Sequence, residues 1–312
     1  MMKKLLVTGA SGLLGMNLAL GLSKKYQIFG VANHITLQGI PFEMVQRDFF
    51  RKDVAAELID TVQPDAVIHC AAMANVDACE KNPEAATELN GEFPGRLAGE
   101  TAKRHIPMIH ISTDAVFDGK ERKENGYTEN DLPHPINVYA RSKLLGEQKV
   151  FEANPDAVVA RVNFYGWSVS GNRSLSEFFY ANLKSGQRVF GFTDVFFCPL
   201  YVWDLAEILE KLLLKNAKGL YHVFSPEFLS KYEFGVNIAG KFGFDPNLIQ
   251  PVSWQAGGLD APRSPYLIMN TDKLREFLGE SLPDQETCLN HFYEAEKSGL
   301  PELIRSFRTD NS

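Results

Sequence analysis

The chain has 312 residues, of which 45% are hydrophobic and 23% are charged, the balance of a soluble globular protein with one large domain or two modest ones. Its net charge of −7, without a basic block, argues against nucleic acid or an anionic membrane surface as the main partner. No stretch approaches the apolar length of a membrane span, and the N-terminal apolar run is short, so we expect neither a span nor a signal peptide. The four scattered cysteines match no disulfide or zinc pattern, so we expect a cytoplasmic protein with reduced thiols and no metal.

The first 110 residues predict alternating strands and helices. Apolar runs predict strands at residues 3–10, 27–33, 64–72 and 106–113, and helical spacing predicts helices at 12–26, 53–63 and 82–105. This alternation predicts right-handed crossovers and a doubly wound parallel sheet with helices on both faces. The near-continuous apolar run "AVIHCAA" fits a strand that is buried on both sides.

The second half of the chain has a different character. Residues 114–137 are rich in Gly, Asn, Asp and Pro and predict a long loop, which is usually functional or disordered. A helix at 138–154 and a strand at 156–166 follow. Helices are then predicted at 175–186, 202–217, 230–245 and 270–280, with a short strand at 219–227. We expect a first domain at 1–165, to which later segments can return, and a smaller C-terminal lobe at 166–312.

The stretch "VTGASGLLG" places Gly9, Gly12 and Gly15 between the first strand and the first helix, with Ser11 and Leu13 among them. One glycine permits the tight turn, the next lets a pyrophosphate approach the backbone, and the last lets helix and strand pack closely. The helix N-terminus offers free N–H groups to the phosphate. Any strand-to-helix turn can use glycine, but this context favours dinucleotide binding and a Rossmann domain.

The end of the second strand bears on the choice between NAD and NADP. A carboxylate there would bind the ribose 2′-hydroxyl of NAD, but the chain has Asn33 or His34 at this place. No arginine is present either, so the sequence leans only slightly towards NADP. Asp48, after the third strand, is a candidate for the adenine amine, and a helix N-cap or loop carboxylate is an equal alternative.

Three further residues suggest proton transfer. Tyr139 and Lys143 lie one helical turn apart in "NVYARSK", so a cation on the same face can lower the pKa of the phenol. Thr113 ends the strand in "HISTDAVFDG", where a doubly wound sheet binds its ligands. A Tyr/Lys pair is common by chance, and "ST" can simply cap a strand.

The motifs "HCAAMANVDACEKNP", "LNGEF", "STDAVFDG", "NVYARSKLLGE", "RVNFYG" and "FFCPLYVWDLA" follow the glycine turn in order. This series resembles the extended short-chain dehydrogenases/reductases, and most of all their dTDP-4-dehydrorhamnose reductase branch. The resemblance covers nearly the whole chain. It implies a Rossmann domain with a substrate-binding lobe and reduction of a keto-deoxy nucleotide sugar by NADPH or NADH. A homodimer would fit the superfamily.

The resemblance also implies roles for individual residues. Thr113 orients the substrate carbonyl, Tyr139 is the general acid, and Lys143 holds the nicotinamide ribose and tunes Tyr139. Ala71 and Ala72 let the cofactor lie against the fourth strand.

On the substrate side, Asp114 fills the acidic position of "STD", and Asp77 and Asn163 border the site or merely hold turns. Arg173 and Arg263 are candidates for the diphosphate, and Arg263 can equally pair on the surface.

Two other functions stay open at this stage. A nucleotide-sugar epimerase or dehydratase of the same superfamily is one, although Asp114 is followed by Ala115 and not by the second carboxylate typical of a dehydratase. The other is a binding protein similar to the regulatory subunit of methionine adenosyltransferase. Departures from the branch pattern at Ala115 and Ala140 leave the substrate itself open.

Overall fold

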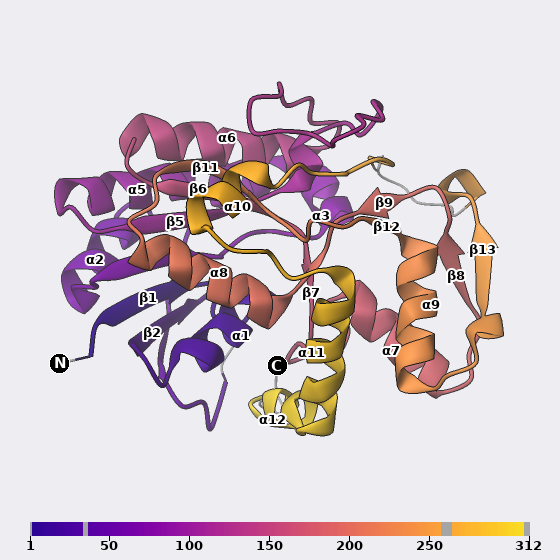
Figure 1. Cartoon of the computed structure of the whole chain (residues 1–312). Coiled ribbons are helices and arrows are strands. Elements are labelled where there is room, and N and C mark those ends of the chain that lie inside the picture. Colours follow the sequence, from indigo (N-terminus) through magenta and orange to yellow (C-terminus); the bar gives the residue numbers. More distant parts are fainter. Residues whose placement is uncertain (1, 34–36, 257–263, 309–312) are drawn as a thin grey trace.

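The computed structural model describes residues 2–33, 37–256 and 264–308, and its centre is a seven-stranded sheet in the order β11-β6-β5-β4-β1-β2-β3 (Figure 1). Every neighbouring pair in it is parallel. Its strands are β1 (Lys4–Thr8), β2 (Gln27–Ala32), β3 (Glu43–Gln46), β4 (Ala66–His69), β5 (Met108–Thr113), β6 (Val158–Val162) and β11 (Gly219–Val223). The strand order reverses between β1 and β4, which is where a doubly wound sheet forms its ligand crevice. The predicted fold class is confirmed.

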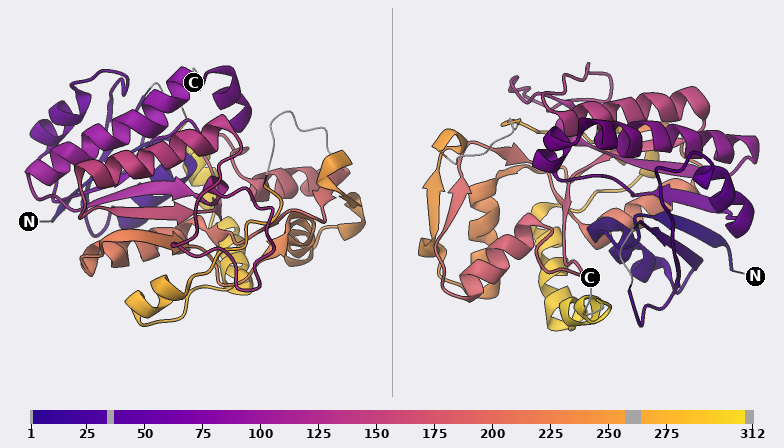
Figure 2. Two further views of the ribbon diagram at one scale, coloured as in Figure 1. Left: turned by 90° about the horizontal axis from the view of Figure 1, so that it is seen from above. Right: turned by 180° about the vertical axis from the view of Figure 1, so that it is seen from behind.

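Helices cover both faces of this sheet. On one face lie α2 (Val54–Val62), α5 (Phe93–Lys103) and α6 (Val138–Ala153), the last two side by side in Figure 2. On the other lie α1 (Leu13–Leu22) and α8 (Val202–Leu214). In β1, Leu5 and Leu6 are both fully buried but belong to opposite cores. Because successive side chains of a strand point to opposite faces, a sheet covered on both sides needs uninterrupted apolar strands.

A smaller lobe lies at one end of the sheet, on the right in Figure 1. It contains α7 (Leu175–Lys184) and α9 (Lys231–Phe242), each of which begins with a serine/glutamate capping box. Two short strand pairs complete it. They are β8 (Val189–Phe192) with β13 (Ile249–Val252), and β9 (Phe196–Phe197) with β12 (Leu229–Ser230).

The other elements are short or connect these layers. They are α3 (Val76–Lys81), α4 (Pro83–Thr87), the π turn η1 (Glu88–Glu92), the 3₁₀ turns η2 (Asp114–Val116), η3 (Pro246–Leu248) and η4 (Trp254–Ala256), β7 (Phe164–Tyr165), β10 (Leu200–Tyr201), α10 (Asp272–Leu278), α11 (Gln285–Lys297) and α12 (Leu300–Ser306). Within the described ranges, no helix is both long and apolar enough to cross a membrane.

The chain leaves the sheet after β6 and later returns to it. Both α8 and β11 follow residue 166, yet α8 covers the sheet and β11 extends it beside β6. The sequence predicts that later segments can return to the first domain. The division into two domains at residue 165 stays a prediction. The helix predicted at 82–105 is divided into α4, η1 and α5.

Candidate active site

The glycine turn between β1 and α1 is packed too closely for a side chain at Gly9 or at Gly15. Gly9 has φ +70°, and a Cβ there would lie 2.7 Å from the Ala71 nitrogen. A Cβ on Gly15 would lie 2.2 Å from the Gly9 carbonyl oxygen. Gly12 is the N-cap of α1 and makes no side-chain cap, and Ser11 and Leu13 beside it are partly exposed. The helix therefore directs backbone N–H groups into the crevice, as a pyrophosphate requires.

The adenosine side of the crevice carries no carboxylate at the end of β2. Asn33 follows that strand, and its Oδ1 is buried without a hydrogen-bond partner among the described residues, whereas His34 lies outside them. A buried polar atom normally has a hydrogen-bond partner, so Asn33 is suited to contact a ligand. The lean towards NADP stays a prediction.

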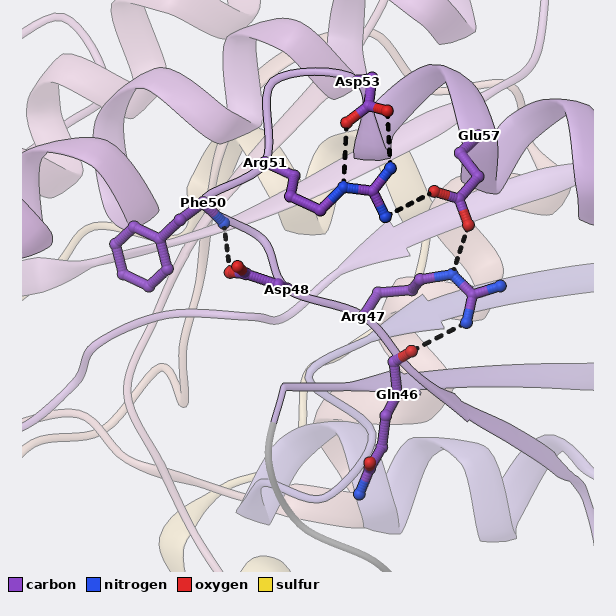
Figure 3. A network of polar contacts seen from close by, with 7 residues as sticks. All are labelled: Gln46, Arg47, Asp48, Phe50, Arg51, Asp53 and Glu57. Carbon is purple, nitrogen blue, oxygen red and sulfur yellow. Dashed lines mark hydrogen bonds and ion pairs between the residues drawn. The ribbon is translucent and has the colours of Figure 1, made fainter.

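Asp48 lies in an exposed turn after β3 (Figure 3). Its Oδ1 accepts a hydrogen bond of 2.9 Å from the Phe50 N–H, which closes the turn. It is not a helix N-cap, because Asp53 occupies that position of α2. The structure therefore supports a loop carboxylate that closes its own turn. The contact with the adenine amine stays a prediction.

The fourth strand ends against the glycine turn. Ala71 is buried, and its N–H lies 3.3 Å from the Thr8 hydroxyl at the end of β1. Ala72 beside it is partly exposed. Small side chains at this point are what a cofactor lying against β4 requires.

At the end of β5, the structure brings Thr113, Asp114 and Asn163 together. The Thr113 hydroxyl donates to Asp114 Oδ1 at 3.0 Å, and Asn163 Nδ2 donates to Asp114 Oδ2 at 2.7 Å. Asp114 is buried, and this desolvation raises the pKa of its carboxyl above the usual value. Asn163 therefore fixes the carboxylate of Asp114, and Asp114 orients the Thr113 hydroxyl. The sequence alone did not indicate this chain of hydrogen bonds.

Tyr139 lies on the first turn of α6, opposite Thr113. The helix begins at Asn137, whose side chain caps the Ala140 N–H at 2.8 Å. Burial raises the pKa of Tyr139 to about 12, while a hydrogen bond with Thr113 acts to lower it. Two hydroxyl groups thus converge where a substrate carbonyl could accept from both.

Lys143 is buried one turn further along α6 and points to β5. Its Nζ donates to the Ile111 carbonyl at 2.6 Å and lies 3.4 Å from His110 Nε2. Burial lowers the pKa of Lys143 to about 8. The ammonium group is thus placed beneath the crevice, and its role as tuner of Tyr139 stays a prediction.

The sequence reading missed Asn90, which lies in the π turn η1. Its side chain accepts from the Met73 N–H at 2.8 Å and donates to the Met73 carbonyl and to the Ser142 hydroxyl. It therefore ties the loop after β4 to α6. The signal available was the asparagine in "LNGEF", a poor helix former inside an otherwise helical pattern.

The other predicted substrate residues, Asp77, Arg173 and Arg263, come from separate segments of the chain. Asp77 lies in the first turn of α3, and Arg173 is exposed just before α7. Arg263 lies outside the described residues. No group of three or more His, Cys, Asp or Glu in the described ranges could hold a metal ion.

Three features together fit an NAD(P) molecule: the glycine turn, the small residues Ala71 and Ala72, and the Asn33 Oδ1 without a partner among the described residues. Thr113 and Tyr139 lie at the same carboxyl edge of the sheet. The class of protein that combines these parts is the extended short-chain dehydrogenase/reductase, an NAD(P)-dependent oxidoreductase. More specifically, the chain belongs to the family described as the RmlD substrate binding domain, whose model matches residues 2–298. The resemblance seen in the sequence is confirmed.

Individual relatives agree with this family. The chain is 37% identical over 289 residues to the probable low-salt glycan biosynthesis reductase Agl14 of Haloferax volcanii, across 91% of this chain and 95% of that protein. It is 31% identical over 271 residues to the mouse methionine adenosyltransferase 2 subunit beta, across 80% and 75%. Among solved structures, dTDP-4-dehydrorhamnose reductase of Bacillus anthracis in complex with NADP matches with a TM-score of 0.84 and 29% identity, across 94% and 99%.

Proposed function

We propose that this protein reduces the ketone of a 4-keto-6-deoxy nucleotide sugar with NADPH or NADH. The observation that carries the proposal is the placement of Thr113 at the end of β5 and of Tyr139 on the first turn of α6, next to the buried Lys143. The similarity to a dTDP-4-dehydrorhamnose reductase and to a probable glycan biosynthesis reductase supports a nucleotide sugar as substrate.

The chemistry follows from these side chains. Bound NAD(P)H supplies the hydride, and the protein supplies position and a proton. The Thr113 proton, which Asp114 accepts in this structure, turns to the substrate oxygen, while Asn163 keeps Asp114 in place. Tyr139 donates to the same oxygen and gives up its proton as negative charge develops there. Lys143 stabilises the resulting phenolate, since a nearby cation favours the charged form.

The diphosphate contacts are part of the proposal. Arg173 is exposed before α7, so its guanidinium is available to a phosphate, and Arg263 remains a candidate from the sequence. Asp77 is proposed to border the sugar. A homodimer, a cytoplasmic location and the absence of nucleic-acid binding remain predictions from the superfamily and from the net charge of −7.

The test is oxidation of NADPH and NADH with dTDP-4-keto-6-deoxyglucose, alone and with a 3,5-epimerase. We expect sugar-dependent oxidation that falls by about a hundredfold or more in kcat for Tyr139→Phe. Tyr293→Phe, on α11, is the matched control and should retain wild-type rates. Cofactor binding without oxidation in the presence of any keto sugar would refute the proposal.

A second candidate is a regulatory subunit, because mouse methionine adenosyltransferase 2 subunit beta is 31% identical to this chain. Stable association with a methionine adenosyltransferase, together with no sugar-dependent oxidation, would favour this function. An epimerase or dehydratase has less support, since Ala115 stands where a dehydratase typically has a second carboxylate.

A further inference from the structure

An ion pair is buried directly behind the candidate active site. Glu147, on α6, and Arg161, on β6, have side chains that are 5% and 3% exposed. Arg161 Nε donates to Glu147 Oε1 at 2.9 Å, and Arg161 Nη2 donates to Oε2 at 2.7 Å. Both carboxylate oxygens are therefore engaged by one guanidinium in bidentate geometry, the strongest form of such a pair.

This pair is attached to the catalytic strand. The Ser112 hydroxyl donates to Glu147 Oε1 at 2.6 Å, and Ser112 immediately precedes Thr113. One residue earlier, the Ile111 carbonyl accepts the bond from Lys143 Nζ. Lys143 and Glu147 are four residues apart on α6, so they lie on one face of the helix. Consecutive residues of β5 thus meet consecutive turns of α6.

Glu147 is also the charged neighbour of Lys143. The other titratable groups around Lys143 are His69 on β4, Cys70 after it and His110 on β5, and burial lowers the pKa of both imidazoles and raises that of the thiol to about 12. These three are neutral at physiological pH, and Tyr139 is protonated. The negative charge of Glu147 acts to raise the pKa of Lys143, against burial, which lowers it.

The far side of Arg161 is enclosed as well. Its guanidinium carbon lies 5.0 Å from the centre of the Phe117 ring, and its Nη1 lies 3.4 Å from His222 Nε2. Burial keeps His222 neutral by lowering its pKa to about 3. Buried ion pairs add little net stability compared with well-packed apolar residues. A contribution to stability therefore does not explain why Glu147 and Arg161 are buried as an ion pair.

We propose that Glu147 is a positioning residue for the reaction: it holds the end of β5 that carries Thr113, and it places a carboxylate one helical turn from Lys143 as the counter-charge of that ammonium group. Arg161 fixes both carboxylate oxygens of Glu147 in the apolar interior. The inference rests on the proposed role of Lys143 in cofactor binding.

The experiment measures NADPH dissociation constants by fluorescence between about pH 6 and pH 10, where Lys143 titrates. The kcat for the sugar is measured over the same range. The variants are Glu147→Gln, the neutral pair Glu147→Gln with Arg161→Gln, Glu147→Asp and Ser112→Ala. Thermal denaturation of each variant reports its folding. Wild-type binding should weaken above about pH 8, as Lys143 loses its proton.

Loss of the Glu147 charge should move this midpoint down by about one pH unit or more, both in Glu147→Gln and in the neutral double variant. Glu147→Asp and Ser112→Ala both keep a carboxylate at position 147, so the pH midpoint of NADPH binding should stay. Both disturb the hydrogen bond between Ser112 and residue 147, so kcat should fall. A neutral double variant with the wild-type midpoint would show a purely structural pair and overturn the inference, as would a shifted midpoint in Glu147→Asp. The binding midpoint decides the question even if no sugar is reduced, because that result refutes the proposed function and leaves the charge effect of Glu147 on cofactor binding intact.

Discussion

Gly15→Ala is the substitution for which the structure makes the sharpest prediction. The new methyl carbon would lie 2.2 Å from the Gly9 carbonyl oxygen and 3.0 Å from the Ala10 Cα, both backbone atoms. Gly9 cannot retreat, because its own Cα faces the Ala71 backbone, where a Cβ would already be 2.7 Å away. Helix α1 must therefore move away from β1. Overpacking of this kind costs about 1–3 kcal/mol.

The displacement should affect the cofactor more than the fold. A loss of about 1.4 kcal/mol in binding corresponds to a tenfold higher Kd, so we expect NADPH to bind at least about tenfold more weakly. Fluorescence titration measures the Kd, and thermal denaturation measures the stability. Gly21→Ala on the same helix is the matched control, since its Cβ would lie 3.6 Å from the Trp203 ring, an ordinary contact. Equal affinity and melting temperature in Gly15→Ala and Gly21→Ala would refute the argument.

Two further substitutions test the cofactor side and the π turn. Asn33→Asp should weaken NADPH by about tenfold and leave NADH equal or tighter, because a carboxylate at the end of β2 repels a 2′-phosphate and accepts from a 2′-hydroxyl. Asn216→Asp, after α8, adds the same charge outside the crevice as a control, and an unchanged NADPH/NADH ratio in Asn33→Asp would contradict the placement. Asn90→Ala should destabilise the protein by about 1–3 kcal/mol in denaturant unfolding, because the Met73 N–H loses its partner. Asn182→Ala on α7 should change the free energy of unfolding by less than about 0.5 kcal/mol, and a similarly small effect at Asn90 would refute its bridging role.

Local patterns were sufficient for much of the fold. The apolar strands and the glycine turn predicted the doubly wound sheet, because each depends on residues close in sequence. The order of the motifs along the chain predicted the family. Helix α11 was not predicted, since Cys288 and Phe292 are its two buried residues and give too narrow an apolar stripe. Strands β8 and β13 are four residues each, and Gly191 and Pro251 obscure their pattern.

The interior of the site was beyond the reach of sequence patterns for a different reason. The π turn at Asn90 depends on tertiary packing, since a Cβ on Gly146 of α6 would lie 2.2 Å from the Asn90 carbonyl oxygen. Likewise, the sequence placed Lys143 beside Tyr139 but could not show that its ammonium group bonds to the Ile111 carbonyl. Contacts between segments this far apart are set by how the layers pack, and no local spacing encodes them.

Tyr139 and Lys143 are shifted in opposite directions by the same cause. Burial disfavours both charged forms, so the pKa of the phenol rises to about 12 and that of the ammonium group falls to about 8. A phenol that holds its proton this firmly stays ready to donate it, and it releases the proton only when alkoxide charge develops on the substrate. The desolvated site is therefore suited to reduction, and the charge of Glu147 opposes the premature loss of the lysine proton.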